Sequence, residues 1–280
     1  MTDAITILHD SFGPTGALTK NWGFAALVEF RGKRILFDTG NDANVFATNV
    51  AAIGADLGRL DFVVISHRHG DHTTGLAHVL EKSPGVPVYV PKEIYGVFGS
   101  SLPGSFYPRC PTLPIEMRYY DGFPPDLIRH GTPWRDADFR AVATTTEIVP
   151  GVVAVHTVSD VAETRDMPEL SLSLRSDGGQ VVVAGCSHPG IEKILAAASG
   201  RELPVRCIFG GLHLVLSPAA EIERLAAALR NEWRVESVAP GHCTGEPAFD
   251  VLRRAFGGAY RLAGLGMRIG IAAPARTGGG

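Results

Sequence analysis

Residues 66–75 read Ser-His-Arg-His-Gly-Asp-His-Thr-Thr-Gly and follow directly after the apolar run Phe62-Val-Val-Ile65. This stretch packs four side chains of metal-binding type into six positions, namely His67, His69, Asp71 and His72. Ligands this close can face one point only if the chain leaves a strand and turns sharply. His67 and His69 alternate by two and point the same way in an extended segment, so Asp71 with His72 can serve a second position after the turn. The pattern therefore predicts a metal centre with two positions, rather than a polar surface turn.

The kinds of ligand indicate which metal and which chemistry to expect. Neutral imidazoles and a carboxylate suit zinc, while manganese and iron fit the same donors because geometry and supply decide selectivity more than raw affinity. We therefore expect Zn²⁺ at about two ions per chain, with Mn²⁺ or Fe as alternatives. A divalent metal lowers the pKa of bound water to about 7 and polarises a carbonyl or phosphoryl oxygen. This chemistry predicts a metal-dependent hydrolase, or an enzyme of a related condensation or transfer.

The composition describes a folded protein without a strong field for polyanions. The chain has 280 residues, of which 45% are hydrophobic, and this is enough for a well-buried core. Its formal net charge of -3 gives no general attraction for nucleic acid or an anionic membrane. No basic and apolar leader opens the sequence and no apolar run reaches about 18 residues, so we expect a cytoplasmic protein. The four cysteines lie far apart without a Cys-x-x-Cys pair, which disfavours a disulfide scaffold and a zinc ribbon.

Three later turns repeat the order of apolar strand, histidine-bearing turn and helix. Each histidine stands just past a predicted strand: His188 after 181–184, His213 after 207–209 and His242 after 235–239. In open α/β sheets this edge is where ligands bind, so these turns can converge with residues 67–72 on one site. The alternative for His188 is a helix cap, and for His213 and His242 a buried hydrogen-bonded ring.

An aspartate also ends an early strand. Asp38 follows the predicted strand 34–37 and would lie at the same edge. A carboxylate there can accept the N–H of a ligand imidazole and so fix its tautomer. The alternative for Asp38 is an Asx turn at the strand exit.

Together these motifs resemble the metallo-β-lactamase-fold superfamily over most of the chain. The matching motifs are the strand ending in Asp38-Thr-Gly40, the His67-x-His69-x-Asp71-His72 run and the late His242. A narrower likeness is to its dihydropteroate-synthase-like branch, 7,8-dihydropterin-6-methyl-4-(β-D-ribofuranosyl)aminobenzene-5′-phosphate synthase-like. The motifs of that branch are Trp22-Gly-Phe24, Gly185-Cys-Ser-His-Pro-Gly190, Gly210-Gly-Leu-His-Leu214 and Gly241-His-Cys-Thr-Gly245.

The resemblance implies an architecture and a set of residue roles. The fold would be α/β, a four-layer αβ/βα sandwich in one domain over residues 1–271, with a dinuclear site at one edge of two packed sheets. Asp71 would orient the nucleophile, and His213 would contact the substrate or donate a proton to the leaving group. The implied ligands are His67, His69 and His188 for one metal, and Asp71, His72 and His242 for the other.

Two positions depart from the family pattern. Arg68 stands where the branch usually has glycine. Cys186 stands where most of the superfamily has a metal-bridging aspartate. Without this carboxylate, we expect the second metal to bind more weakly than the first or to be absent, unless the Cys186 thiolate is itself a ligand.

The stretch 91–150 interrupts the strand-turn-helix pattern and is rich in proline and aromatic residues. A long irregular insertion in a compact domain is usually functional or disordered, and this one has enough large apolar side chains to pack. We expect a lid whose substrate-binding residues are Tyr107, Arg109 and Trp134, with arginine available for an anionic group such as phosphate. A cap over the core or a contact in a homo-oligomer is equally open. Residues 272–280 are expected to form a flexible tail.

The leading function is hydrolysis of a small molecule, phosphorylated or aromatic, by a metal-bound hydroxide. The alternatives are a synthase or transferase in pterin chemistry, a lactonase or thioesterase, and a mononuclear-iron oxidoreductase, which metal analysis would separate. Neither nucleic acid nor a membrane is an expected partner. No Gly-x-Ser-x-Gly elbow, Walker loop or dinucleotide fingerprint offers a competing chemistry.

Overall fold

The first of two large β-sheets is built mainly from the N-terminal half of the chain. The computed structural model describes residues 3–14, 16–93, 97–106, 108–199 and 202–271. In this sheet the strand order is β15-β1-β2-β3-β4-β5-β8, and β3, β4, β5 and β8 run parallel. The strands are β1 (Ala4–His9), β2 (Ala25–Phe30), β3 (Lys33–Phe37), β4 (Phe62–Val64), β5 (Pro87–Pro91), β8 (Asp138–Val142) and β15 (Arg268–Gly270).

The second sheet is built from the C-terminal half. Its strand order is β14-β13-β12-β11-β10-β9, with an antiparallel half from β9 to β12 and a parallel half from β12 to β14. The strands are β9 (Thr146–Val149), β10 (Val152–Val158), β11 (Pro168–Ser176), β12 (Gly179–Ala184), β13 (Val205–Gly211) and β14 (Ser237–Gly241).

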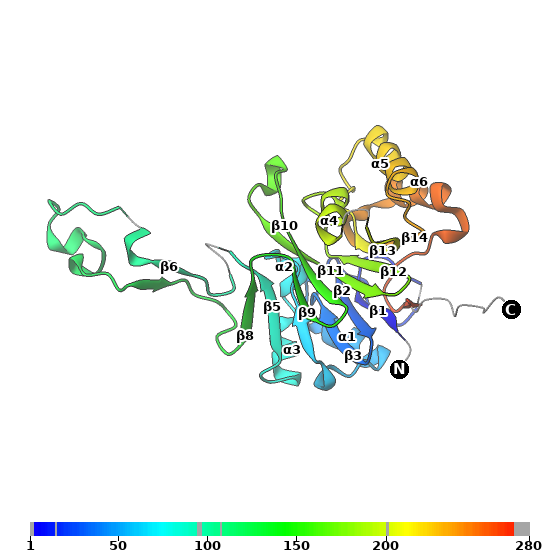
Figure 1. Ribbon diagram of the computed structural model, residues 1–280. Coiled ribbons are helices and arrows are strands. Elements are labelled where there is room, and N and C mark those ends of the chain that lie inside the picture. The colour runs from blue at the N-terminus through cyan, green and yellow to red at the C-terminus, as the bar shows by residue number, and fades with distance from the viewer. Residues whose placement is uncertain (1–2, 15, 94–96, 107, 200–201, 272–280) are drawn as a thin grey trace.

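Helices cover the outer faces of both sheets. The helices are α1 (Ala43–Ile53), α2 (Gly70–Thr73), α3 (Leu76–Lys82), α4 (Ile191–Ala198), α5 (Ala219–Asn231) and α6 (Glu246–Phe256). Figure 1 shows α4, α5 and α6 on one side of the paired sheets, and α1 and α3 on the opposite side. Three apolar clusters fill the spaces between these layers, one between the sheets and one under each group of helices. This arrangement confirms the expected α/β fold, a four-layer αβ/βα sandwich.

The short strand β4 shows how the sequence reaches this packing. Phe62 and Val64 belong to the core between the sheets, while Val63 and Ile65 belong to the core under α1 and α3. A strand buried on both faces needs apolar side chains at successive positions, and this is why residues 62–65 form an unbroken apolar run. The candidate metal ligands therefore begin just after the last residues of this strand that pack into the two apolar clusters.

Helix ends also have local causes. The side chain of Asp42 accepts hydrogen bonds from the N–H groups of Asn44 and Val45, which caps the start of α1. Gly54 ends α1 in a left-handed conformation that has little cost for glycine.

Among the described residues, no helix combines the length and the apolar character that a membrane span requires.

The segment expected to be irregular over 91–150 is shorter in the structure. Strands β8 and β9 belong to the two main sheets. The sequence did not predict them, because exposed strands can carry polar residues and give no apolar run. The remaining part forms an arm around the two-stranded sheet of β6 (Ser101–Pro103) and β7 (Leu127–Arg129), which extends away from the sandwich in Figure 1. The expected tail, 272–280, lies outside the described residues.

Candidate metal centre

The predicted ligands meet at one edge of the sandwich. Parallel strands β3 and β4 end there in one sheet, and β12, β13 and β14 end there in the other, so the turns after them face one another. Two trios have ligand atoms that all lie within 4.8 Å of one another: His67, His69 and His188 in the first, and Asp71, His72 and His242 in the second. These are the two sets that the family resemblance implied.

The first trio presents ring nitrogens at a spacing that suits one ion. His67 Nε2 lies 3.1 Å from His69 Nδ1, and two nitrogens bound to one zinc at about 2.0–2.1 Å are separated by a similar distance. The His188 ring centroid lies 4.6 Å from that of His67. Burial, followed by the neighbouring imidazoles His72 and His188, holds the pKa of His67 well below its usual value. His67 is therefore neutral, which is the form that binds a metal.

The second trio contains buried ring nitrogens that lack hydrogen-bond partners among the described residues. His242 Nε2 lies 3.5 Å from Asp71 Oδ2, and His72 Nε2 lies 3.7 Å from the same oxygen. His242 is buried, and neither of its ring nitrogens has a hydrogen-bond partner among the described residues. Buried polar atoms without partners are costly and rare. A cation between Asp71, His72 and His242 would satisfy them, so the donor set fits a metal.

Asp38 and Ser66 hold the inner rings in place. Asp38 Oδ2 lies 2.7 Å from His72 Nδ1 and also accepts a hydrogen bond of 2.7 Å from Ser66 Oγ. Ser66 Oγ in turn lies 2.8 Å from His67 Nδ1. Burial opposes the charged form of His72, but Asp38 together with Asp71 and Cys243 outweighs burial and raises the pKa of His72 to about 9, so a metal bound there would have to displace a proton. The contact of Asp38 with His72 is the one that an imidazole-orienting carboxylate would make.

Two further carboxylates support the site and were not identified from the sequence. Glu169, fully buried on β11, accepts the N–H groups of Ser187 (2.7 Å) and His188 (2.9 Å) and lies 3.0 Å from His188 Nδ1. Asp10 follows β1 and accepts the N–H of His242 at 3.0 Å, while burial raises its pKa to about 7. Asp10 ends a strand as Asp38 does, which is a signal in the sequence, whereas Glu169 stands at a polar position of the alternating strand β11 and carries no such signal.

The backbone is strained around the same edge. Asp38, Ser187, His213 and His242 have positive φ angles, from 46° to 67°, which non-glycine residues rarely adopt. Gly185 leaves no room for a side chain, because a Cβ atom there would meet Ser66 Oγ and lie 2.8 Å from Asp38 Oδ2. Strain of this kind clusters at functional sites, which agrees with the position of the two trios.

A family comparison agrees with this geometry. The model of a beta-lactamase superfamily domain matches residues 33–185, which is more than half of the chain. The chain belongs to this superfamily. The matched region contains β3, the run His67–His72 and the end of β12, and therefore most of the first trio.

Individual relatives agree with the superfamily assignment. The 7,8-dihydropterin-6-methyl-4-(beta-D-ribofuranosyl)-aminobenzene-5'-phosphate synthase of Methanocaldococcus jannaschii is 24% identical over 285 residues, 90% of this chain and 90% of that protein. The crystal structure of Tm1679, a metal-dependent hydrolase of the beta-lactamase superfamily, is 27% identical with TM-score 0.71, over 97% of this chain and 100% of its own. The metallo-beta-lactamase fold protein YhfI from Bacillus subtilis has TM-score 0.58 at 12% identity over 95% of this chain and 97% of its own, which supports the fold alone. The resemblance inferred from the motifs is confirmed.

Cys186 lies where the superfamily pattern led us to expect a bridging aspartate. Its Sγ lies 3.2 Å from His72 Nε2, and Cys186, His67 and His72 form a further trio within 4.8 Å. It therefore lies close to a ligand of each set. Burial raises the pKa of the Cys186 thiol well above its usual value, so a nearby cation is needed to make it a thiolate.

Cobalt spectroscopy tests whether Cys186 is a ligand. We expect the Co²⁺-loaded protein to show a thiolate-to-cobalt charge-transfer band, because a coordinating thiol is deprotonated by the ion. The band should disappear in Cys186→Ala and persist in Cys207→Ala, whose half-buried thiol lies in a separate cavity. A band of unchanged intensity in Cys186→Ala would show that this sulfur does not give rise to it.

His213 lies beside the first trio. Its ring centroid is 4.3 Å from that of His188, and the residue is exposed. A hydrogen bond with Cys243 raises the pKa of His213 above its usual value. An exposed imidazole with a raised pKa beside the ligands suits a proton donor, and this role of His213 stays a prediction.

The predicted substrate residues of the arm lie elsewhere. Arg109 lines a cavity of about 230 Å³ enclosed by residues 108–122 of the arm itself. Trp134 packs against Phe98 and Phe139, with centroid distances of 6.5 Å and 6.3 Å. Tyr107 lies outside the described residues. The structure therefore does not bring Arg109 or Trp134 to the metal edge, because the arm points away from the sandwich (Figure 1).

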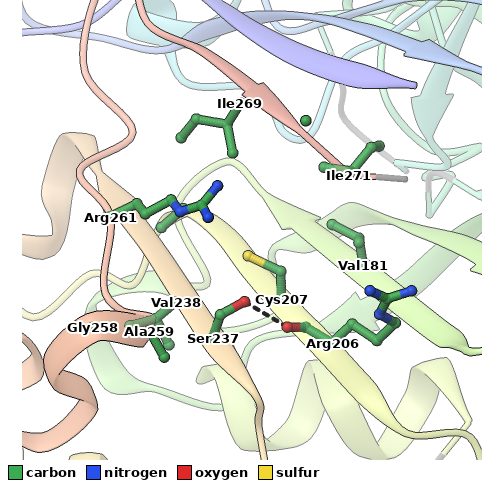
Figure 2. Close-up of a pocket in the computed structure, with 12 residues that line it drawn as sticks. Val181, Arg206, Cys207, Ser237, Val238, Gly258, Ala259, Arg261, Ile269 and Ile271 are labelled. Atoms are coloured by element: carbon green, nitrogen blue, oxygen red, sulfur yellow. Dashed lines mark hydrogen bonds between the residues drawn. The ribbon is translucent and has the colours of Figure 1, made fainter. Parts of the chain in front are cut away.

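A separate cavity lies at a distance from the metal edge. Figure 2 shows Arg206 and Arg261 on either side of Cys207, in a cavity of about 210 Å³ near β15. The residues that β13 and β14 contribute to it lie at or before the middle of these strands, whereas the candidate ligands follow the strand ends. None of the predicted ligands lines this cavity.

Proposed function

We propose that this protein is a metal-dependent hydrolase acting on a small molecule. The observation that carries the proposal is the pair of ligand trios at one sheet edge, with buried His242 nitrogens that lack partners among the described residues. The proposed ions are two Zn²⁺, with Mn²⁺ or Fe as alternatives. When bound, a divalent ion supplies a water of lowered pKa and polarises the bond under attack.

The chain's own groups provide orientation and proton transfer. Although burial opposes its ionisation, the nearby imidazoles of His242 and His72 hold the pKa of Asp71 well below its usual range. Asp71 thus stays a carboxylate that can accept a hydrogen bond from the attacking water. His213 is the proposed proton donor to the leaving group. Asp38 and Glu169 keep His72 and His188 oriented through bonds to their Nδ1 atoms.

A second candidate is a synthase or transferase in pterin chemistry. It is favoured by the synthase from M. jannaschii, whose likeness extends over 90% of both chains. A lactonase, a thioesterase and a mononuclear-iron oxidoreductase use related sites and stay as alternatives to be separated by metal and substrate. A contact between copies through the arm and a cytoplasmic location likewise stay predictions.

Metal analysis combined with a substrate panel tests the proposal. The protein would be purified without added metal, analysed for its elements, and assayed on phosphoesters, lactones and thioesters with zinc or manganese. We expect about two zinc or manganese ions per chain and metal-dependent turnover of one ester class. About one iron per chain would favour the oxidoreductase, and no bound metal after reconstitution would overturn the hydrolase.

A further inference from the structure

A groove of about 550 Å³ is lined by residues that neighbour the first trio and its supporting carboxylate in the sequence. Arg68, which lines it, stands between the ligands His67 and His69 in the sequence. Pro168, which also lines it, directly precedes Glu169, whose carboxylate contacts His188. The N–H of Leu170 donates to the carbonyl of Ser66 at 2.8 Å and joins the two segments that carry Arg68 and Pro168. The groove is therefore continuous with the ends of the elements that hold the first trio.

Cationic side chains outnumber acidic ones in this groove. Arg68, Lys92 and Arg165 line it, against Glu93 and Asp166. Lys92 and Arg165 are exposed, and neither forms an ion pair with another described residue. Charged nitrogens that face solvent without a partner are available to a ligand. The wall has apolar parts as well, from Val158 and Pro168.

Glu93 holds one of these cations in place. Its side chain is 3% exposed, and its carboxylate lies 3.4 Å from Arg68 Nη1. Its second oxygen, Oε2, is buried without a hydrogen-bond partner among the described residues. A buried carboxylate facing a guanidinium that is 40% exposed fixes that guanidinium while its other N–H groups stay accessible. The Arg68 side chain is thus held at the wall of the groove rather than free in solvent.

We propose that this groove binds an anionic oxygen group of the substrate, a carboxylate or a phosphate, through Arg68, Lys92 and Arg165. The proposal rests on the proposed function, since it places the anionic end of the substrate beside the centre where its bond is cleaved. Val158 and Pro168 pack against the uncharged stem of the substrate. The volume lies within the usual range for small-molecule sites, about 300–1,000 Å³.

Calorimetry on the zinc-loaded full chain tests the groove without requiring turnover. Inorganic phosphate and succinate are titrated separately into the wild type, Lys92→Gln/Arg165→Gln and Arg253→Gln. The last variant removes an exposed cation of α6 that lies outside the groove. We expect at least one anion to bind the double variant about tenfold or more weakly than the wild type, because each charged hydrogen bond has a substantial effect. Arg253→Gln should match the wild type, and all three proteins should hold the same zinc content.

The two probes identify the group. Loss of phosphate affinity alone assigns a phosphate, loss of succinate affinity alone assigns a carboxylate, and loss of both assigns a general anion site. An unchanged affinity in the double variant, no binding of either anion, or an equal loss in Arg253→Gln would overturn the proposal. If the wild type has no hydrolytic activity but the double variant binds anions more weakly, the groove is supported and the hydrolase proposal is rejected. If the wild type hydrolyses anionic esters and the double substitution does not change the rate, the hydrolase is supported and the groove is rejected.

Discussion

Replacing His188 with alanine is expected to lower the zinc content from about two ions per chain to about one, and the affinity of the first site by at least about 100-fold. The reason is that the first trio has three protein donors, and removing one leaves a site of two imidazoles. Equilibrium dialysis with elemental analysis would measure both quantities. If a substrate has been found, turnover should fall by about 10³-fold, because the ion supplies several kcal/mol of transition-state stabilisation.

The matched control is His78→Ala on α3. His78 is a partly buried histidine that belongs to neither trio, and it packs near Phe46. It should leave the zinc content unchanged, so a loss of metal in both variants would point to general destabilisation. An unchanged zinc content in His188→Ala would contradict the first trio. His242→Ala provides the corresponding test of the second trio.

The sequence predicted those parts of the site that depend on local spacing. The apolar run 62–65 followed by His67–His72 fixed where the ligands begin, because a strand buried on both faces must end before polar side chains can gather. The repeated order of strand, histidine and helix then predicted that His188 and His242 would reach the same edge. Parallel strands bring their carboxyl ends together, so this inference needed no long-range contact information.

Other parts depend on packing that a pattern does not encode. Glu169 supports His188 across the boundary between β11 and the turn after β12, a contact set by the pairing of the two strands. The groove is formed by residues from Arg68 to Pro168, which are brought together only by the fold. Aromatic content alone favoured Trp134 as a substrate contact, but its ring instead packs at the base of the arm against Phe98.

Glu169→Ala is expected to destabilise the protein by about 3–5 kcal/mol, the usual cost of breaking a buried charged network. The carboxylate is fully buried and accepts two backbone N–H groups, and alanine would leave both of these donors without a partner. Glu169→Gln keeps the shape of the side chain and one acceptor oxygen, so the free energy of unfolding should fall by less, about 1–2 kcal/mol. Urea unfolding of the metal-free proteins would measure these differences without the added stabilisation from bound zinc.

The pH dependence separates the charge of Glu169 from its shape. Burial opposes ionisation, but the bonds from His188 and Ser187 outweigh it and hold the pKa of Glu169 below its usual 4.5. A carboxylate whose pKa is lowered by folding contributes stability that is present above the unfolded pKa and is lost as the pH falls through the folded pKa. The stability gap between the wild type and Glu169→Gln should therefore be constant near neutral pH and shrink as the pH falls below 4.5. A gap that stays constant through this range would show that the negative charge of Glu169 does not stabilise the fold.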